Sequence, residues 1–380
     1  MKNLLIPCLL LLASCSKTFD KQHSSTTNTE KETCSFGIAE FNMIKRSTIN
    51  NEVGKGKPGT GTGGNGGGGT TTPTTPPAPT PLSVIYLDFN GQYVASTMWN
   101  TNGPITCAPA NLNVEEIDLI VQRVTTDYAP FNVMVTTDEA VYNSGNYSKR
   151  MRVIVTESWE WFGQAGGVSY LNSFTWANNT PCFVFSSLLG YDVKRIAEAC
   201  SHEAGHTLGL RHQSSYDENG IKLSDYNWGQ GSGEIGWAPI MGASYNQNLS
   251  LWHYGPNSLS ATTMQDDVAK IAAVVGLASD EYSNSPSNAT AISTSKTGMI
   301  NSNTDVDFFL VNINSIKTLS LVPANVGANN EGGNLDLVLK IYNSQGALMS
   351  AINDPMILNA GITMAPGSYY VAASTTDNQY

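Results

Sequence analysis

The chain is poor in basic residues and in histidine, and it lacks a long apolar run beyond its N-terminus. Its 20 Lys and Arg stand against 31 Asp and Glu, which gives a formal net charge of −11. Nucleic-acid binding depends on basic patches, so this composition argues against a nucleic-acid partner. No segment beyond the N-terminus reaches the roughly 18 apolar residues of a membrane helix. The chain has 380 residues, 41% of them hydrophobic, which is enough for two or three packed domains.

Three of only five histidines fall in one short stretch, in the pattern H-E-x-x-H-x-x-G-x-x-H. His202 and His206 are four residues apart, so on a helix both imidazoles project from one face and can bind one ion. Glu203 is placed to act on a metal-bound water and not to bind the metal. Gly209 can adopt positive φ, which lets the chain leave the helix sharply and bring back His212 as a third ligand.

Three protein nitrogens leave the fourth tetrahedral position to water, which is the arrangement of a catalytic zinc. A bare H-E-x-x-H pattern also arises by chance, on a helix that carries two surface histidines. The extended pattern is far more specific and favours the catalytic interpretation.

The extended pattern resembles that of the metzincin zinc endopeptidases, and residues 237–242 (WAPIMG) resemble the metzincin Met-turn. The resemblance implies that Met241 forms an apolar floor beneath the histidines, a role close to that of any buried methionine. In several metzincin groups the residue after the third histidine is diagnostic. Here it is Gln213, which matches none of them, so the subfamily stays open. Tyr245 is a weak candidate for an oxyanion-stabilising tyrosine, and the sequence favours a rim or core aromatic.

The predicted fold class is α+β. Residues 82–280 are expected to form a metzincin-like catalytic domain, with a mixed, mostly parallel sheet and a zinc-binding helix. Residues 281–380 are expected to form an all-β sandwich. Hydrophobic periodicity in the first of these regions predicts a zinc-binding helix that starts near Asp192 and two further helices at 114–128 and 264–277. It also predicts strands at 84–89, 132–136, 152–156 and 182–186.

A short strand before the zinc-binding helix is the candidate for substrate binding. In metzincins the substrate peptide pairs in extended form with an edge strand, and main-chain pairing of this kind accepts many sequences. The alternative is an ordinary sheet edge. The candidate residues are Gly167, Val168, Ser169, Tyr170 and Leu171.

The last hundred residues alternate between short apolar strands and Asn, Gly and Pro turns, which is typical of an antiparallel β-sandwich. Residues 305–309 and 366–371 resemble bacterial pre-peptidase C-terminal domains, which accompany secreted proteases. Asp305, Asp307 and Asp336 are candidate calcium ligands, with solvated turn aspartates as the alternative.

The first 15 residues have a basic start, a short apolar run and small residues, the pattern of a secretory signal peptide. Residues 12–15 (LASC) also resemble a bacterial lipobox, in which Cys15 becomes the lipidated first residue. This predicts export and a lipid anchor to a bacterial membrane, at the outer membrane or cell surface, or release to the outside. An ordinary signal peptide with a coincidental cysteine is the alternative.

Residues 16–81 are expected to be a disordered stalk or short propeptide that ends in a Gly/Thr/Pro linker. With Cys8 removed and Cys15 lipidated, four cysteines remain, which are Cys34, Cys107, Cys182 and Cys200. In an oxidising compartment they could form up to two disulfides. Cys182 with Cys200 is the preferred pair, and two free buried thiols are the alternative. Cys34 is a further, weak candidate for a zinc ligand in a latent form, because its surroundings lack a recognisable propeptide motif.

Together these features predict a secreted, membrane-anchored zinc endopeptidase that acts on proteins or peptides, with Glu203 as general base. One alternative is a surface adhesin whose metal site is vestigial. Another is a zinc peptidase outside the metzincins, with a distant glutamate in place of His212.

Overall fold

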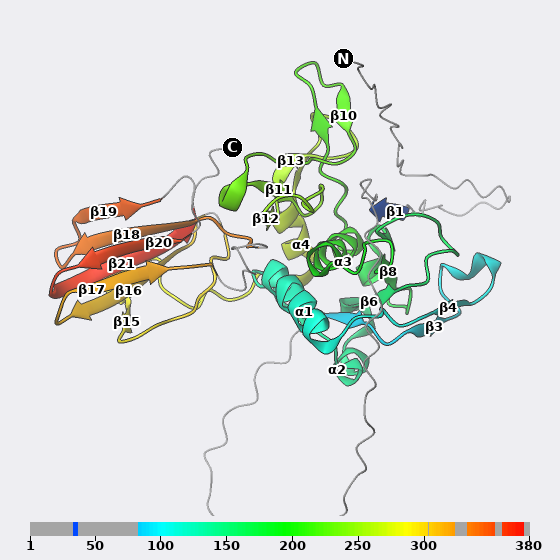
Figure 1. Cartoon of the computed structure of the whole chain (residues 1–380), viewed down its shortest axis with the longest axis horizontal. Helices are drawn as coiled ribbons and strands as arrows, with labels where there is room; N and C mark the ends of the chain where they lie inside the picture. The colour runs from blue at the N-terminus through cyan, green and yellow to red at the C-terminus, as the bar shows by residue number, and fades with distance from the viewer. Residues whose placement is uncertain (1–32, 37–82, 303, 324–332, 354–358, 376–380) are drawn as a thin grey trace, which may run out of the picture.

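The computed structural model describes residues 33–36, 83–302, 304–323, 333–353 and 359–375. The predictions for residues 1–15, including lipidation of Cys15, and for most of the stalk and linker lie outside these residues. Of the helices in the described ranges, none is long and apolar enough to cross a membrane. Figure 1 shows a mixed α/β region that carries the helices, and beside it a region of strands at the C-terminal end.

A six-stranded sheet, in the order β1-β7-β8-β6-β2-β5, forms the centre of the α/β region. Three of its pairings, β2 with β5, β2 with β6 and β6 with β8, are parallel. β7 runs antiparallel to β8 on one side and to β1 on the other. The sheet is therefore mixed and mostly parallel, as predicted. Its strands are β1 (Thr33–Phe36), β2 (Ser83–Asp88), β5 (Val133–Thr136), β6 (Arg150–Thr156), β7 (Gly167–Tyr170) and β8 (Cys182–Phe185).

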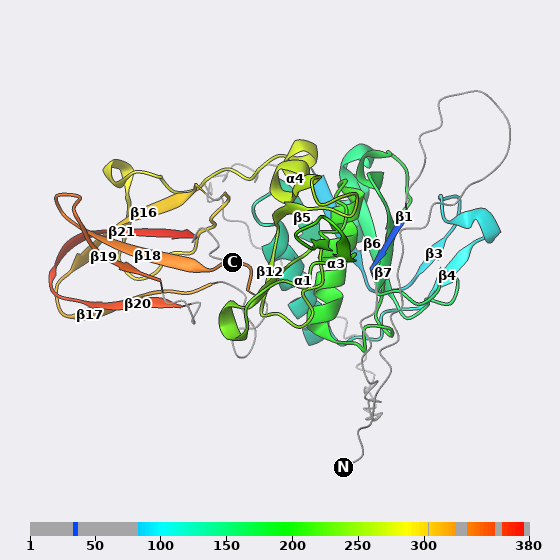
Figure 2. The same ribbon diagram turned by 90° about the horizontal axis from the view of Figure 1, so that it is seen from above.

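Both faces of the central strands are buried because helices cover one side and an aromatic cluster covers the other. Val153 and Val155 of β6 pack toward α1 (Val114–Tyr128) and α3 (Val193–Thr207), which lie side by side in Figure 2. Ile154 points the opposite way, into a cluster beneath a small hairpin. Alternation along the strand places successive side chains on opposite faces. The hairpin strands are β3 (Gln92–Val94) and β4 (Ile105–Cys107), and α2 (Glu139–Ser144) lies beside β2.

Short paired strands and a final helix follow α3. The predicted helix over 264–277 is shorter in the structure, because residues 264–266 form a strand and Asp266 caps the helix by accepting the Ala269 N–H at 2.9 Å. The elements are β9 (Ser215–Tyr216), β10 (Lys222–Ser224), β11 (Trp237–Pro239), β12 (Leu249–Leu251), β13 (Tyr254–Pro256), β14 (Met264–Asp266) and α4 (Asp267–Val275). The 3-10 turns are Asn100–Asn102, Tyr147–Lys149, Ser173–Thr175, Gly233–Ile235 and Pro286–Asn288.

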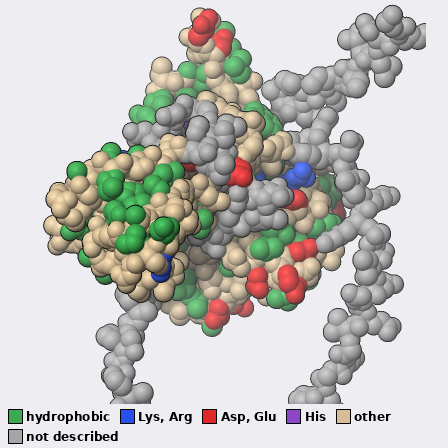
Figure 3. All heavy atoms as spheres, turned by 60° about the vertical axis from the view of Figure 1, so that its left-hand side comes forward, with side chains coloured by type: hydrophobic (Ala, Val, Ile, Leu, Met, Phe, Trp, Pro, Cys, Tyr) green, Lys and Arg blue, Asp and Glu red, His purple; other side chains and the backbone are tan. Residues whose placement is uncertain are grey.

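The C-terminal region consists of a five-stranded sheet, in the order β15-β16-β21-β18-β19, and a two-stranded sheet of β17 and β20. Phe309, Leu339 and Met364 belong to one buried cluster that the two sheets share. Figure 3 shows further hydrophobic side chains on the near end of this region and few Lys or Arg. The strands are β15 (Thr290–Ile292), β16 (Val306–Ile313), β17 (Lys317–Leu321), β18 (Leu337–Asn343), β19 (Leu348–Ile352), β20 (Ala360–Met364) and β21 (Gly367–Thr375).

The predicted disulfide between Cys182 and Cys200 is wrong. Within the described residues both are free thiols, as is Cys107, and all three are buried. Cys182 and Cys200 lie in the core between the sheet and α3, where they pack as small apolar side chains. Burial raises the pKa of the Cys200 thiol above its ordinary value, which keeps the thiol protonated.

Candidate metal centre

The metal-binding pattern lies on the second half of α3, where every residue from Ile196 to Thr207 is buried. Asp192 caps the helix, because its carboxylate accepts the Arg195 N–H at 2.9 Å. The helix packs against the sheet and alongside α1, so its histidines are held in the protein interior. His202, Glu203 and His206 are each fully buried.

A tight turn after α3 returns the chain to the helix. Gly209 has φ +98°, a conformation that side-chain-bearing residues rarely adopt, and it directs the chain back toward His212. The turn is closed by the Leu210 N–H, which donates to the Gly205 carbonyl at 3.1 Å. A Cβ at Gly209 would also lie 2.6 Å from Oδ1 of Asn172. The glycine in the pattern is therefore required both by its φ and by its neighbour.

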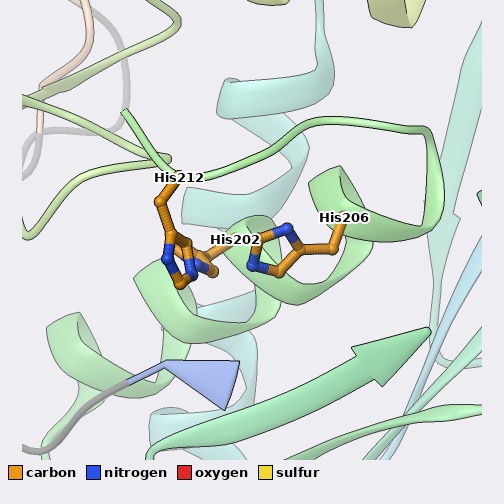
Figure 4. A group of neighbouring side chains, drawn as sticks. All are labelled: His202, His206 and His212. Carbon is orange, nitrogen blue, oxygen red and sulfur yellow. The ribbon is translucent and has the colours of Figure 1, made fainter. Parts of the chain in front are cut away.

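The three histidines converge as the sequence predicts. One ring nitrogen from each of His202, His206 and His212 lies within 4.8 Å of the other two. Figure 4 shows two of the rings coming from α3 and the third from the loop that follows it. The ring centroids are 4.6 to 5.2 Å apart. Among the residues that the structure describes, no other histidine belongs to the group, so these three form the candidate metal centre.

Backbone carbonyls orient two of the imidazoles. Nδ1 of His202 lies 2.7 Å from the Ile240 carbonyl, and Nδ1 of His206 lies 2.7 Å from the Leu210 carbonyl. A carbonyl can only accept, so each Nδ1 carries the proton and each Nε2 keeps its lone pair. Burial, followed by the neighbouring histidines, lowers the pKa of His202 well below its ordinary value. A neutral donor set of three imidazole nitrogens fits a zinc ion.

Met241 packs against α3. It is fully buried, and its Sδ would be 2.7 Å from a Cβ at Gly205, the residue that precedes the second helical ligand. The adjacent Ile240 carbonyl is the one that holds His202. The turn therefore packs against the helix through its methionine and orients a ligand through its backbone.

Gln213 ties the third-ligand loop to two other parts of the fold. Its N–H donates to the Met241 carbonyl at 2.8 Å, and its carbonyl accepts the Asn227 N–H at 2.7 Å. Its side-chain amide donates to Oδ1 of Asp267 at 3.0 Å, at the start of α4. The residue after His212 is thus a buried connector between the loop, the Met241 turn and α4. Its hydrogen bonds fix the backbone position next to His212.

One tyrosine contacts the histidines, and it is not the one that the sequence indicated. Tyr226, which the sequence did not single out, lies with its ring centroid 4.5 Å from that of His212. Nothing in its local sequence distinguishes it, because the contact joins residues on two separate loops. Tyr245 is buried in the main core, where burial and then the charge of Glu198 raise its pKa well above the ordinary value. Its position agrees with a core aromatic.

Glu203 lies directly beneath β7. Oγ of Ser169 donates to Oε2 of Glu203 at 2.6 Å, and both side chains are fully buried. A Cβ at Gly167 would lie 2.6 Å from Cγ and 2.8 Å from Oε1 of the same glutamate. The strand predicted to bind substrate therefore also positions the predicted general base. The Ser169 hydroxyl binds the carboxylate, and the lack of a side chain at Gly167 leaves room for it.

The remaining residues of the predicted strand have packing roles. Val168 points to the opposite face of the sheet, into the aromatic cluster. Tyr170 stacks on Trp99 with ring centroids 4.2 Å apart, and Leu171 is buried just past the end of β7.

The outer edge of β7 accepts another strand, and that strand is β1 from the same chain. The two pair antiparallel in the register Cys34 with Ser169 and Phe36 with Gly167. β1 also contacts α3, the helix that carries two of the three histidines. Cys34, considered above as a latent zinc ligand, lies in this strand, of which the structure describes the backbone.

We expect Gly167→Ala to impair the site through Glu203. The added methyl group has to displace the carboxylate arm or the strand, which is expected to cost about 1–3 kcal/mol in unfolding free energy. A displacement of about 1 Å at a reacting group lowers a turnover rate about a hundredfold. Thermal unfolding and peptide cleavage measure the two effects.

The matched control is Gly361→Ala, where a Cβ would meet only the Leu319 carbonyl at 3.5 Å, an ordinary contact. Wild-type cleavage by a stable Gly167→Ala protein would show that Glu203 does not depend on this approach.

Comparison with known proteins assigns no family to this arrangement. No family model matches the chain, and neither a curated protein nor a solved structure matches it. What the site can do therefore follows from its own residues: three converging imidazoles, one buried carboxylate and a strand edge that pairs with an extended segment.

Proposed function

We propose that the protein is a zinc-dependent endopeptidase. The observation that carries this proposal is the convergence of one ring nitrogen each from His202, His206 and His212 within 4.8 Å of one another. Glu203, which follows His202 in the chain, is buried on the same helix. The three imidazoles would hold the ion. When bound there, zinc supplies a water of pKa near about 7 and polarises the carbonyl to be attacked.

The protein's own groups supply the proton transfer and the positioning. Glu203, held by Ser169, takes a proton from the attacking water and passes it to the departing amine nitrogen. Burial of the carboxylate excludes bulk water, which strengthens its interaction with nearby charges. Met241 packs against the helix at Gly205, and Gln213 binds the loop that carries His212 to Asp267, so both restrict the ligands.

An extended peptide is the substrate shape that the strand edge favours. β7 pairs antiparallel with β1, which supports the inference that the backbone groups of this edge can bind an extended chain. Main-chain pairing of this kind accepts many sequences. We propose that substrate takes the place of β1 on this edge, and that β1 competes with it.

The finer fold assignments belong to the same proposal. The mixed sheet, the helix that carries two ligands and the buried methionine turn support a metzincin-like catalytic domain over residues 82–280. The two C-terminal sheets with their shared core support a β-sandwich of the pre-peptidase C-terminal type. Export and a lipid anchor at Cys15 remain proposals from the sequence.

The first test is Glu203→Gln, with zinc content and cleavage of unstructured casein as the two readouts. Loss of a general base lowers turnover on the order of a hundredfold to ten-thousandfold. Zinc content should stay at the wild-type level, because the glutamate is not a ligand. The matched control is Glu218→Gln, the same change at an exposed position. Wild-type turnover by Glu203→Gln would refute the role of the carboxylate. Zinc in both wild type and variant with cleavage by neither would indicate a latent or highly selective enzyme, or the adhesin alternative.

His212→Ala tests the ligand set. Loss of one of three ligands should weaken zinc binding by more than about a hundredfold, the upper end of the loss seen for outer-shell partners. The control is His253→Ala, which removes a histidine that packs on Trp237 with ring centroids 5.0 Å apart. Unchanged zinc affinity in His212→Ala would support the alternative in which a distant glutamate completes the site.

Competition by β1 is tested with Ser35→Pro in the full chain. Proline lacks the N–H that a paired strand donates and disfavours pairing, so β1 should leave the edge more readily. We expect kcat/KM for a peptide substrate to rise severalfold. Ser25→Pro, outside the paired segment, should leave the kinetics unchanged. Equal kinetics in the two variants would mean that β1 does not obstruct substrate.

A further inference from the structure

Three carboxylates gather where the chain enters the C-terminal region, away from the histidine centre. One oxygen from each of Asp280, Asp305 and Asp307 lies within 4.8 Å of the other two. Asp280 follows α4, whereas Asp305 and Asp307 lie at the start of β16. Two segments that are 25 residues apart thus bring like charges together. Asp336, which the sequence paired with Asp305 and Asp307 as a calcium ligand, is not part of this group.

Two of the carboxylates are buried with oxygens that no donor satisfies. Asp305 and Asp307 are 3% and 2% exposed. Oδ1 of each has no hydrogen-bond partner, while Oδ2 of Asp305 accepts the Asn301 N–H at 2.8 Å. A buried carboxylate oxygen without a partner is costly, and such groups in folded proteins are paired or bind metal ions. A positive charge bound between the carboxylates would satisfy these oxygens.

No protein cation supplies that charge. Among the described residues, no Lys or Arg forms an ion pair with any of the three carboxylates. Burial, followed by the charges of Asp305, Glu281 and Asp280, raises the pKa of Asp307 to about 7. Without a cation, repulsion among the three carboxylates therefore increases as the pH rises and they ionise.

We propose that Asp280, Asp305 and Asp307 bind one calcium ion. Carboxylate oxygens are hard ligands, which calcium prefers and which zinc sites seldom use alone. Two oxygens at the usual calcium distance of about 2.3–2.6 Å from the ion lie at most about 5 Å apart, which agrees with the observed cluster. Calcium also tolerates irregular geometry and water ligands, whereas magnesium requires a near-octahedral shell.

The ion would fasten the connecting segment to the C-terminal sheet. That segment already lies along β16: the Phe308 N–H donates to the Ser283 carbonyl at 3.0 Å, and the Tyr282 ring packs 4.8 Å from the ring of Phe309. Asn284 Nδ2 donates to Oδ2 of Asp280 at 3.2 Å, which orients that carboxylate. A calcium ion would add a cross-link between Asp280 and β16, and it would stabilise this junction against unfolding and proteolysis.

The test compares wild type with Asp307→Asn in the full chain, freed of divalent ions and reloaded with one equivalent of zinc. We expect about 5 mM calcium to raise the wild-type Tm by about 5 °C. Asp307→Asn should lose this shift. In the absence of calcium it should be at least as stable as wild type, because the amide is neutral and removes the repulsion within the cluster. A variant that merely unfolds would instead be less stable under both conditions.

Terbium supplies an independent readout, since Tyr282 lies beside the site and its N–H donates to Oδ1 of Asp280 at 3.0 Å. Tyrosine-sensitised terbium emission should appear with wild type, be displaced by calcium more readily than by magnesium, and vanish in Asp307→Asn. Asp118→Asn, an exposed aspartate on α1, should behave as wild type. An unchanged Tm with calcium, or an equal shift in Asp307→Asn, would overturn the proposal. Neither readout depends on peptide cleavage, so the result is separate from that of the zinc site.

Discussion

At Gly167 the backbone of β7 lies against the carboxylate arm of Glu203, and no side chain fits between them. This close approach depends on the packing of α3 against the sheet, which buries the helix from Ile196 onward. The same packing buries His202 and His206, whose ring nitrogens lie within 4.8 Å of each other and of His212. A helix with this sequence on the surface would expose two ordinary histidines and a solvated glutamate. Burial against β7 makes them a candidate metal centre.

The third ligand depends on connections that are distant in the sequence. The turn at Gly209 reverses the chain, and Gln213 then binds the loop to the Met241 turn and to Asp267. Each connection removes freedom from the loop that carries His212. A ligand held in this way loses little conformational entropy when it binds a metal, which is the benefit of preorganisation. Gln213, which matches none of the residues that are diagnostic in metzincin groups, is here a buried residue that connects the loop to two other parts of the fold.

The C-terminal region shows a second way to handle buried charge. The histidine centre contains neutral rings that can accept a cation, whereas the cluster around Asp307 contains repelling carboxylates. In our proposals both are completed by an ion, but with opposite consequences for the empty state. An empty set of imidazoles is tolerated, while an empty set of buried carboxylates is destabilised by its own charge. The junction between the two regions would therefore depend on calcium more than the zinc site depends on zinc.

The sequence by itself determined the local features. The bounds of α1, the capped start of α3, the central strands and the convergence of three histidines all followed from periodicity, caps and the spacing of one motif. Contacts between distant segments could not be read in this way. The Ser169–Glu203 hydrogen bond, the Tyr226–His212 stack, the Asp280–Asp307 cluster and the free thiols of Cys182 and Cys200 were decided by the tertiary structure. Periodicity reports which face of an element is buried, but which residues meet there depends on how the elements pack.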